Sequence, residues 1–153
     1  MKKLLPFCLI LALGLSAGCK TLFTSTTTAA VFTPLNVAKG TQDTVTAAAM
    51  LFLANNPSYT AEVAAAADAF SVLAKGNLTA LTPADLKAAL ANTSISTKTQ
   101  TQIAAIASLA LTTFEQDFST NLPSLQPQYA LFVQAVANGL NAGLGKATVP
   151  LSP

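Results

Sequence analysis

The chain has 153 residues and a formal charge of +2, and 52% of its residues are hydrophobic while only 9% are charged. All eight basic residues are Lys, and the chain contains no Arg, no His and no Trp. An Arg-rich face for nucleic acid is therefore excluded, and His-based acid–base or metal chemistry has no residues to use. The length favours one domain, large enough to bury a core without metals, cofactors or disulfides.

The N-terminus has the layout of a secretory signal peptide. Residues 1–3 carry two Lys, and residues 4–15 form an apolar run that is too short for a membrane span of about 20 residues. Both cysteines, Cys8 and Cys19, lie in or directly after this region, with no partner further along the chain. A disulfide framework is therefore excluded.

The segment Leu15-Ser16-Ala17-Gly18-Cys19 resembles the lipobox of bacterial lipoproteins. In that family Leu most often stands three positions before the cysteine, whereas here Ser16 holds that position and Leu15 precedes it. The resemblance implies cleavage between Gly18 and Cys19, a lipid on the Cys19 thiol, and a membrane as partner. Because Lys20 rather than Asp follows the cysteine, the family's sorting rule implies the outer membrane, facing the periplasm, in a Gram-negative host.

Two alternatives to lipidation stay open. An ordinary signal peptide cut after Gly18 leaves an unmodified Cys19 on a secreted protein, and an uncleaved segment acts as an anchor. The lipoprotein interpretation divides the chain into a signal peptide (1–18), a lipidated Cys and Thr-rich tether (19–34), a helical domain (35–147) and a C-terminal tail (148–153).

The domain after Pro34 is rich in Ala, the residue with the highest helix propensity, and the whole chain contains 30 Ala. We expect an all-α fold, a small bundle of about five antiparallel helices with short connections. The expected helices run from Thr41 to about Asn55, from Pro57 to Lys75, from Pro83 to about Ala91, from Ser96 or Thr97 to about Thr120, and from Pro127 to about Leu144.

Capping residues mark two of these starts. Thr82 precedes Pro83, and Asp85 follows in the first turn, which is the clearest helix start in the chain. Thr97 and Gln100 have the spacing of a capping box at the start of the fourth helix.

Apolar periodicity predicts which faces are buried. In the first helix, Met50, Leu51 and Leu53 lie off the apolar stripe, so we expect its second half to be buried on more than one side. In the fourth helix, Leu109 and Leu111 lie off the stripe, which indicates a central helix contacted from two sides. The predicted inner stripes are Val45, Ala48, Ala49 and Phe52; Val63, Ala66, Ala67, Phe70 and Leu73; Ile103, Ile106, Ala110, Phe114 and Phe118; and Tyr129, Phe132, Val133, Val136 and Leu140.

Asp117 is the most unusual polar residue, because helical geometry places it on the apolar face of the fourth helix. A buried carboxylate needs a partner or becomes protonated. We expect the helix to fray or bend so that Asp117 reaches water; a buried pair with a Lys is the alternative. Glu115 and Asp117 point about 200° apart on a helix, so they cannot share one substrate atom.

No other motif carries recognisable chemistry. Gly139 and Gly143 have GxxxG spacing, which we interpret as close packing against a neighbouring helix and helix termination, because Asn138 and Asn141 flank them. Ser71 and Lys75, one turn apart, are a weak nucleophile pair without a His. The acidic residues are scattered, so no metal cluster is expected. Catalytic and metal-binding residues are therefore predicted to be absent, and the protein is predicted not to be an enzyme.

Two functions remain for the domain. The first is a structural or protein-interaction role in the bacterial envelope, with another envelope protein as partner. The alternative is a binding module for a small apolar ligand or lipid between the helices. Removal of Lys2 and Lys3 with the signal peptide leaves six Lys against six acidic residues, so the mature chain is neutral.

Overall fold

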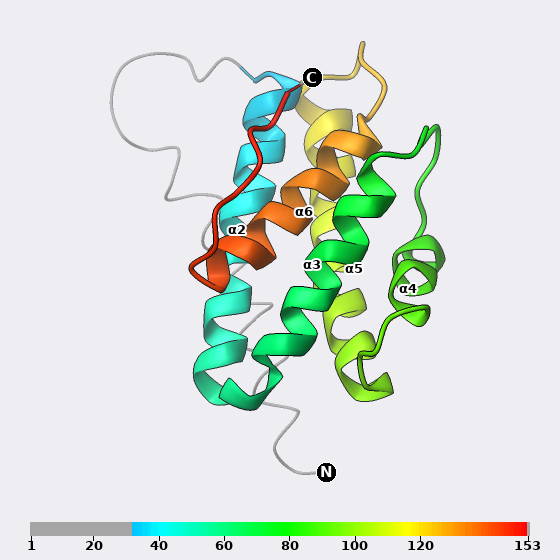
Figure 1. Cartoon of the computed structure of the whole chain (residues 1–153). Helices are drawn as coiled ribbons and strands as arrows, with labels where there is room; N and C mark the ends of the chain where they lie inside the picture. The colour runs from blue at the N-terminus through cyan, green and yellow to red at the C-terminus, as the bar shows by residue number, and fades with distance from the viewer. Residues whose placement is uncertain (1–31, 153) are drawn as a thin grey trace, which may run out of the picture. The chain divides into compact units, whose positions relative to one another are not determined.

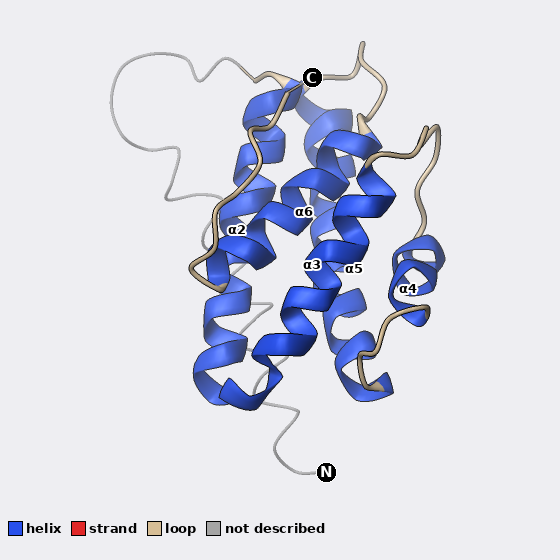
Figure 2. Cartoon of the chain, in the orientation of Figure 1, coloured by secondary structure: helices blue, strands red, loops and turns tan. Residues whose placement is uncertain are grey.

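The structure, a computed structural model, describes residues 32–152, and the predicted signal peptide and residues 19–31 of the tether lie outside them. This part of the chain is built from helices and loops and contains no strand (Figure 2). The prediction of an all-α bundle is confirmed. The helices are α2 (Pro34–Asn55), the short 3-10 helix η1 (Pro57–Tyr59), α3 (Thr60–Ala74), α4 (Pro83–Ala91), α5 (Thr97–Asn121) and α6 (Tyr129–Gly143).

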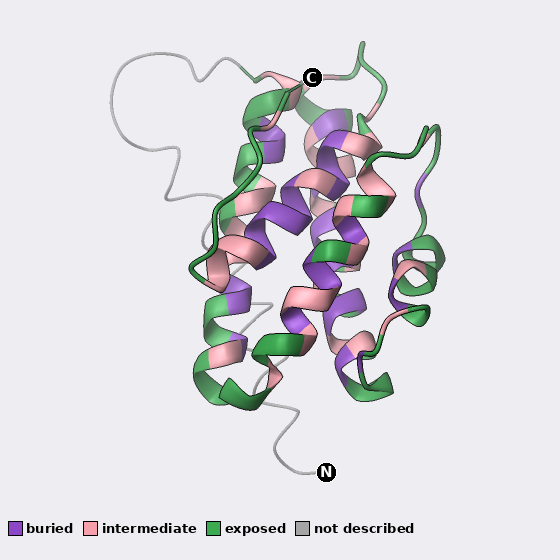
Figure 3. Cartoon of the chain, in the orientation of Figure 1, coloured by how far each residue is buried: buried purple, intermediate pink, exposed green. Residues whose placement is uncertain are grey.

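Helix α6 is the centre of the bundle, packed between α2 and α3 (Figure 1). Every residue from Leu131 to Leu140 is buried except Gln134 (Figure 3). The ring centroid of Phe132 lies 5.0 Å from that of Phe114 on α5, and the ring centroids of Phe114 and Phe118 are 4.7 Å apart. A helix that is apolar on all sides is stable only when neighbours surround it. The expectation that the fourth helix would be central is therefore wrong, although α5 is contacted by both α2 and α4.

Two glycines allow α6 to approach α2 closely. A Cβ atom on Gly139 would lie 2.6 Å from the Cβ of Val45 and 2.8 Å from the backbone oxygen of Gln42. A Cβ on Gly143 would lie 2.5 Å from the Cβ of Ala49. The prediction of close packing at this GxxxG pair is confirmed.

These contacts also correct the expected arrangement of the helices. Gly139 faces residues 42–45 and Gly143 faces residues 46–50, so α2 and α6 run in the same general direction. Helix α3 returns antiparallel to α2 through η1, and α5 ends where α6 begins. The bundle is therefore not antiparallel throughout.

Helix α4 begins as predicted. The Thr82 side chain accepts a hydrogen bond from the Asp85 N–H, and the Asp85 carboxylate accepts one from the Thr82 N–H at 2.8 Å. Pro83 occupies the first turn, where its missing N–H is not needed. This reciprocal capping box satisfies two backbone donors that the helix cannot satisfy internally.

Helix α2 begins two turns earlier than predicted. Thr33, not Thr41, caps the helix, and its side chain accepts a hydrogen bond from the Asn36 N–H at 3.2 Å. Pro34 is the first helical residue, so it belongs to the bundle and not to the tether. The Thr41 hydroxyl instead donates to the Val37 carbonyl one turn back, which is a side-chain bond of a helix interior.

The second half of α2 is buried on one side only. Phe52 is 3% exposed, but Met50 is 57% exposed and Leu51 is 51% exposed. The expectation that both would be buried is wrong, because α6 covers the face that carries Val45 and Ala49 and no helix covers the opposite face within the described residues.

We predict that Gly139→Ala lowers the free energy of unfolding by about 1–3 kcal/mol, because the new methyl group overlaps the backbone of α2. The matched control is Gly40→Ala on α2, where a Cβ meets nothing within 4 Å. This control should raise stability by roughly 0.5–1 kcal/mol through helix propensity alone. Urea unfolding followed by circular dichroism measures both changes, and a Gly139→Ala protein as stable as Gly40→Ala would contradict the close approach.

Candidate functional site

The predicted lipidation and cleavage residues, Cys19 and Gly18, lie outside the described residues. The structure therefore bears on the domain that follows them.

Asp117 is half-buried on α5, and burial raises the pKa of its carboxyl group above the usual range. It forms no ion pair or hydrogen bond with any residue of the described part. No buried side-chain polar atom there lacks a partner, so the Asp117 oxygens must reach solvent. The expected contact with water is therefore present. Fraying is not the cause of this contact, because α5 continues past Asp117 to Asn121.

Glu115 lies apart from Asp117 and is used to join two helices. Its carboxylate accepts a hydrogen bond from the Tyr129 hydroxyl at 3.1 Å, which links α5 to the first residue of α6. Burial, this hydrogen bond and the negative charge of Glu115 all raise the pKa of Tyr129. The phenol therefore stays protonated at neutral pH and acts as a hydrogen-bond donor.

Glu62 on α3 caps the N-terminus of α5. Its carboxylate accepts hydrogen bonds from the Ser96 N–H at 3.2 Å and from the Ser96 hydroxyl at 2.9 Å. The hydroxyl of Thr99, followed by these bonds from Ser96, lowers the pKa of Glu62 despite an opposing effect of burial. In an ordinary capping box this carboxylate comes from the third residue of the same helix. Here it comes from a different helix, so the cap also fastens α3 to α5.

The capping box predicted for Thr97 and Gln100 does not form. Ser96 is the N-cap of α5, and its hydroxyl accepts a hydrogen bond from the Thr99 N–H. The Gln100 side chain instead donates to the Ile95 carbonyl at 2.9 Å. Of the two start residues predicted, Ser96 is the capping one, because Thr97 already lies within the helix.

Asn138 on α6 is 1% exposed and holds the C-terminal tail against the bundle. Its amide nitrogen donates to the Val149 carbonyl at 2.6 Å and to the Gln42 side chain at 3.3 Å. Its amide oxygen accepts from the Val149 N–H and from Gln134, each at 3.1 Å. Every donor and acceptor position of the amide is therefore occupied. The role of this residue was not predicted, because Gln42 and Val149 lie outside the local sequence pattern of α6.

A reversal at Gly145 brings the tail back toward Asn138. Gly145 has φ +70°, a conformation that favours glycine, and the Lys146 N–H donates to the Asn141 carbonyl at 2.8 Å. The tail then runs back along the bundle toward the end at which α2 begins (Figure 1).

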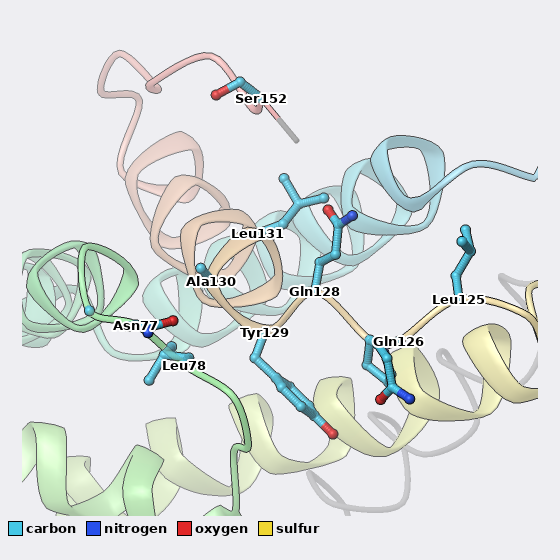
Figure 4. Close-up of a pocket in the computed structure, with 11 residues that line it drawn as sticks. Asn77, Leu78, Leu125, Gln126, Gln128, Tyr129, Ala130, Leu131 and Ser152 are labelled. Atoms are coloured by element: carbon cyan, nitrogen blue, oxygen red, sulfur yellow. The ribbon is translucent and has the colours of Figure 1, made fainter.

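A hollow of about 500 Å³ opens to solvent at that same end of the bundle. Its walls come from the segment after α3, from the connection between α5 and α6, and from the tail (Figure 4). The lining residues are Gly76, Asn77, Leu78, Leu125, Gln126, Pro127, Gln128, Tyr129, Ala130, Leu131 and Ser152. The hollow has a size typical of ligand pockets, but it lies at the end of the bundle and not between the helices.

Among residues 32–152, no group of three or more acidic, Cys or His side chains could hold a metal ion. Within the same range, no helix combines the length and apolar character that crossing a bilayer requires.

Comparisons of the chain with protein-family models, with curated proteins and with solved structures found no match.

The pKa shifts of Glu62 and Asp117 predict opposite effects of neutralising each group. A carboxylate whose folded pKa is lowered stabilises the fold above its unfolded pKa, and this contribution is lost as pH falls through the folded value. Glu62→Gln should therefore lower the free energy of unfolding at pH 7. A carboxyl group whose pKa is raised in the folded state destabilises the fold at pH values above that raised pKa, where the group is charged. Asp117→Asn should therefore raise the free energy of unfolding at pH 7.

Chemical unfolding of both variants at pH 7 and at a series of acidic pH values measures these effects. Each difference from the parent protein should shrink toward low pH, where the parent carboxyl is itself protonated. A Glu62→Gln variant as stable as the parent at neutral pH would contradict the interhelical cap, and a less stable Asp117→Asn variant would contradict the cost of burial.

Proposed function

We propose that this protein is a bacterial lipoprotein, held to a membrane by a lipid on Cys19, with a structural or protein-interaction role in the cell envelope. The observation that carries the proposal is the sequence Leu15-Ser16-Ala17-Gly18-Cys19 directly after a basic and apolar signal segment. Small residues before a cysteine let the backbone lie extended in a peptidase, and the thiol accepts the lipid as a thioether.

Lipidation of Cys19 would supply a stable anchor. A diacylglyceryl group on the thiol brings two acyl chains, and acylation of the new amino terminus adds a third. Two chains are sufficient for lasting membrane attachment, whereas one gives only reversible binding. Lys20 after the cysteine favours delivery to the outer membrane, facing the periplasm, in a Gram-negative host.

The use of polar groups in the domain supports an interaction role over catalysis. Glu62 caps α5, Glu115 fixes Tyr129, and Asn138 binds the tail, so the most heavily bonded polar side chains hold the fold together. Ser71 and Lys75, the weak nucleophile pair, have no hydrogen bond between them in the described part. The mature chain would also be neutral, so it would lack the net charge that steers ionic substrates.

The hollow at the end of the bundle favours a second candidate function, a binding module for a small apolar ligand or lipid. It provides volume, and Leu78, Leu125 and Leu131 provide apolar surface. We rank this function second because the hollow is open and its wall includes three side-chain amides, which apolar ligands do not satisfy.

We predict that Cys19→Ser releases the protein from membranes into the soluble fraction. Serine keeps the size of the side chain but provides no thiol for the lipid. The matched control is Cys8→Ser, which changes the other cysteine inside the predicted signal peptide and should leave membrane retention unchanged. Fractionation of cells grown with labelled palmitate measures retention and lipid incorporation together.

Retention of the Cys19→Ser protein in membranes, or equal labelling of both variants, would contradict the lipid anchor. Loss of retention in both variants would instead indicate that the thiols serve export and not anchoring.

A further inference from the structure

One end of the bundle combines four segments without a Lys, Asp or Glu side chain. They are the start of α2 (32–38), the connection from α3 to α4 (76–84), the end of α5 with the start of α6 (118–131), and the tail (147–152). The hollow brings three of these segments together, and Figure 1 places the start of α2 at the same end. The terminal carboxylate belongs to Pro153, outside the described residues.

These segments also expose apolar side chains. Leu125 is 47% exposed and Leu35 is 37% exposed. Leu125 lies between Pro123 and Pro127 on the connection between α5 and α6, and its side chain points away from Tyr129 (Figure 4). Surface that carries leucine and no charge is readily removed from water, because no ion has to be desolvated.

The tether joins the domain at this same end. Residues 20–31 separate Cys19 from the first described residues of the bundle, and an extended chain of that length reaches about 45 Å. Helix α2 is about 33 Å long at 1.5 Å per residue. Contact between the membrane and the far end of α2 would therefore use most of the tether's reach, while contact at the near end needs little of it.

We propose that this end of the bundle rests on the lipid surface that carries the anchor, with Leu125 inserted at the interface. The proposal rests on the proposed lipid anchor. A tethered domain meets its membrane at a high effective concentration, so a small apolar contact is sufficient to orient it. Lys39 and Lys75, both exposed, border these segments, so an anionic lipid surface should favour the contact.

A tryptophan introduced at Leu125 tests this orientation, since the chain has no Trp of its own. The full chain is purified from membranes in its lipidated form and placed in vesicles of phosphatidylcholine with bromine on the upper acyl carbons. We expect the fluorescence of Leu125→Trp to be shifted to the blue. Its intensity in brominated vesicles should be several-fold lower than in vesicles without bromine. Leu35→Trp, on a different segment of the same end, should behave in the same way.

Met50→Trp is the matched control. Met50 is similarly exposed at 57%, and it lies about 22 Å further along α2 than Leu35. Its fluorescence should remain that of a tryptophan in water and show little quenching. Adding phosphatidylglycerol to the vesicles should preserve or increase this difference, because Lys39 and Lys75 border this end.

Vesicle flotation separates the failure of this inference from the failure of the anchor. Protein that floats with the vesicles but shows equal quenching at positions 125 and 50, or stronger quenching at 50, overturns the orientation alone. Protein that does not float overturns both the orientation and the lipid anchor.

Discussion

The close approach of α6 to α2 is the constraint on which the rest of the domain depends. Helix α6 is buried on nearly every side, so it must be surrounded before it is stable. Gly139 and Gly143 remove the side chains that would hold α2 away, and Val45 and Ala49 of α2 fill the space. Helix α3 covers a second side of α6, and the rings of Phe114 and Phe132 join α5 to it.

Polar side chains complete this packing. Asn138, inside the core, has all of its hydrogen bonds satisfied, and it binds the tail to the bundle. Glu62 supplies from α3 the capping carboxylate that α5 lacks in its own first turn. Charged and amide groups that usually face water are thus used to connect helices.

Where capping residues within one turn mark a helix start and no competing signal lies nearby, the sequence predicts it correctly. Thr82, Pro83 and Asp85 all lie within one turn, so the start of α4 was predicted correctly. The start of α2 at Thr33 and Pro34 was missed because Gly40 and Thr41, poor helix formers, imitate a boundary inside the helix. Burial of the last helix on all sides was missed for a different reason, since it depends on partners in α2 and α3 and not on the sequence of α6 itself.

Long-range contacts explain the remaining errors. Asn138 joins Gln42 and Val149, and Glu62 joins Ser96, across separations that no local pattern encodes. Met50 and Leu51 have the apolar character of core residues, but they lie on the face of α2 that no helix covers within the described residues. The proposed lipid anchor depends instead on a local signal, the short sequence motif that ends at Cys19.

The intact mass of the protein purified from bacterial membranes tests the proposed anchor most directly. The account predicts a chain that begins at Cys19, has lost residues 1–18, and carries the added mass of a diacylglyceryl group, with or without a further acyl chain. A chain that begins at any other residue, or one that begins at Cys19 with a free thiol, would contradict it.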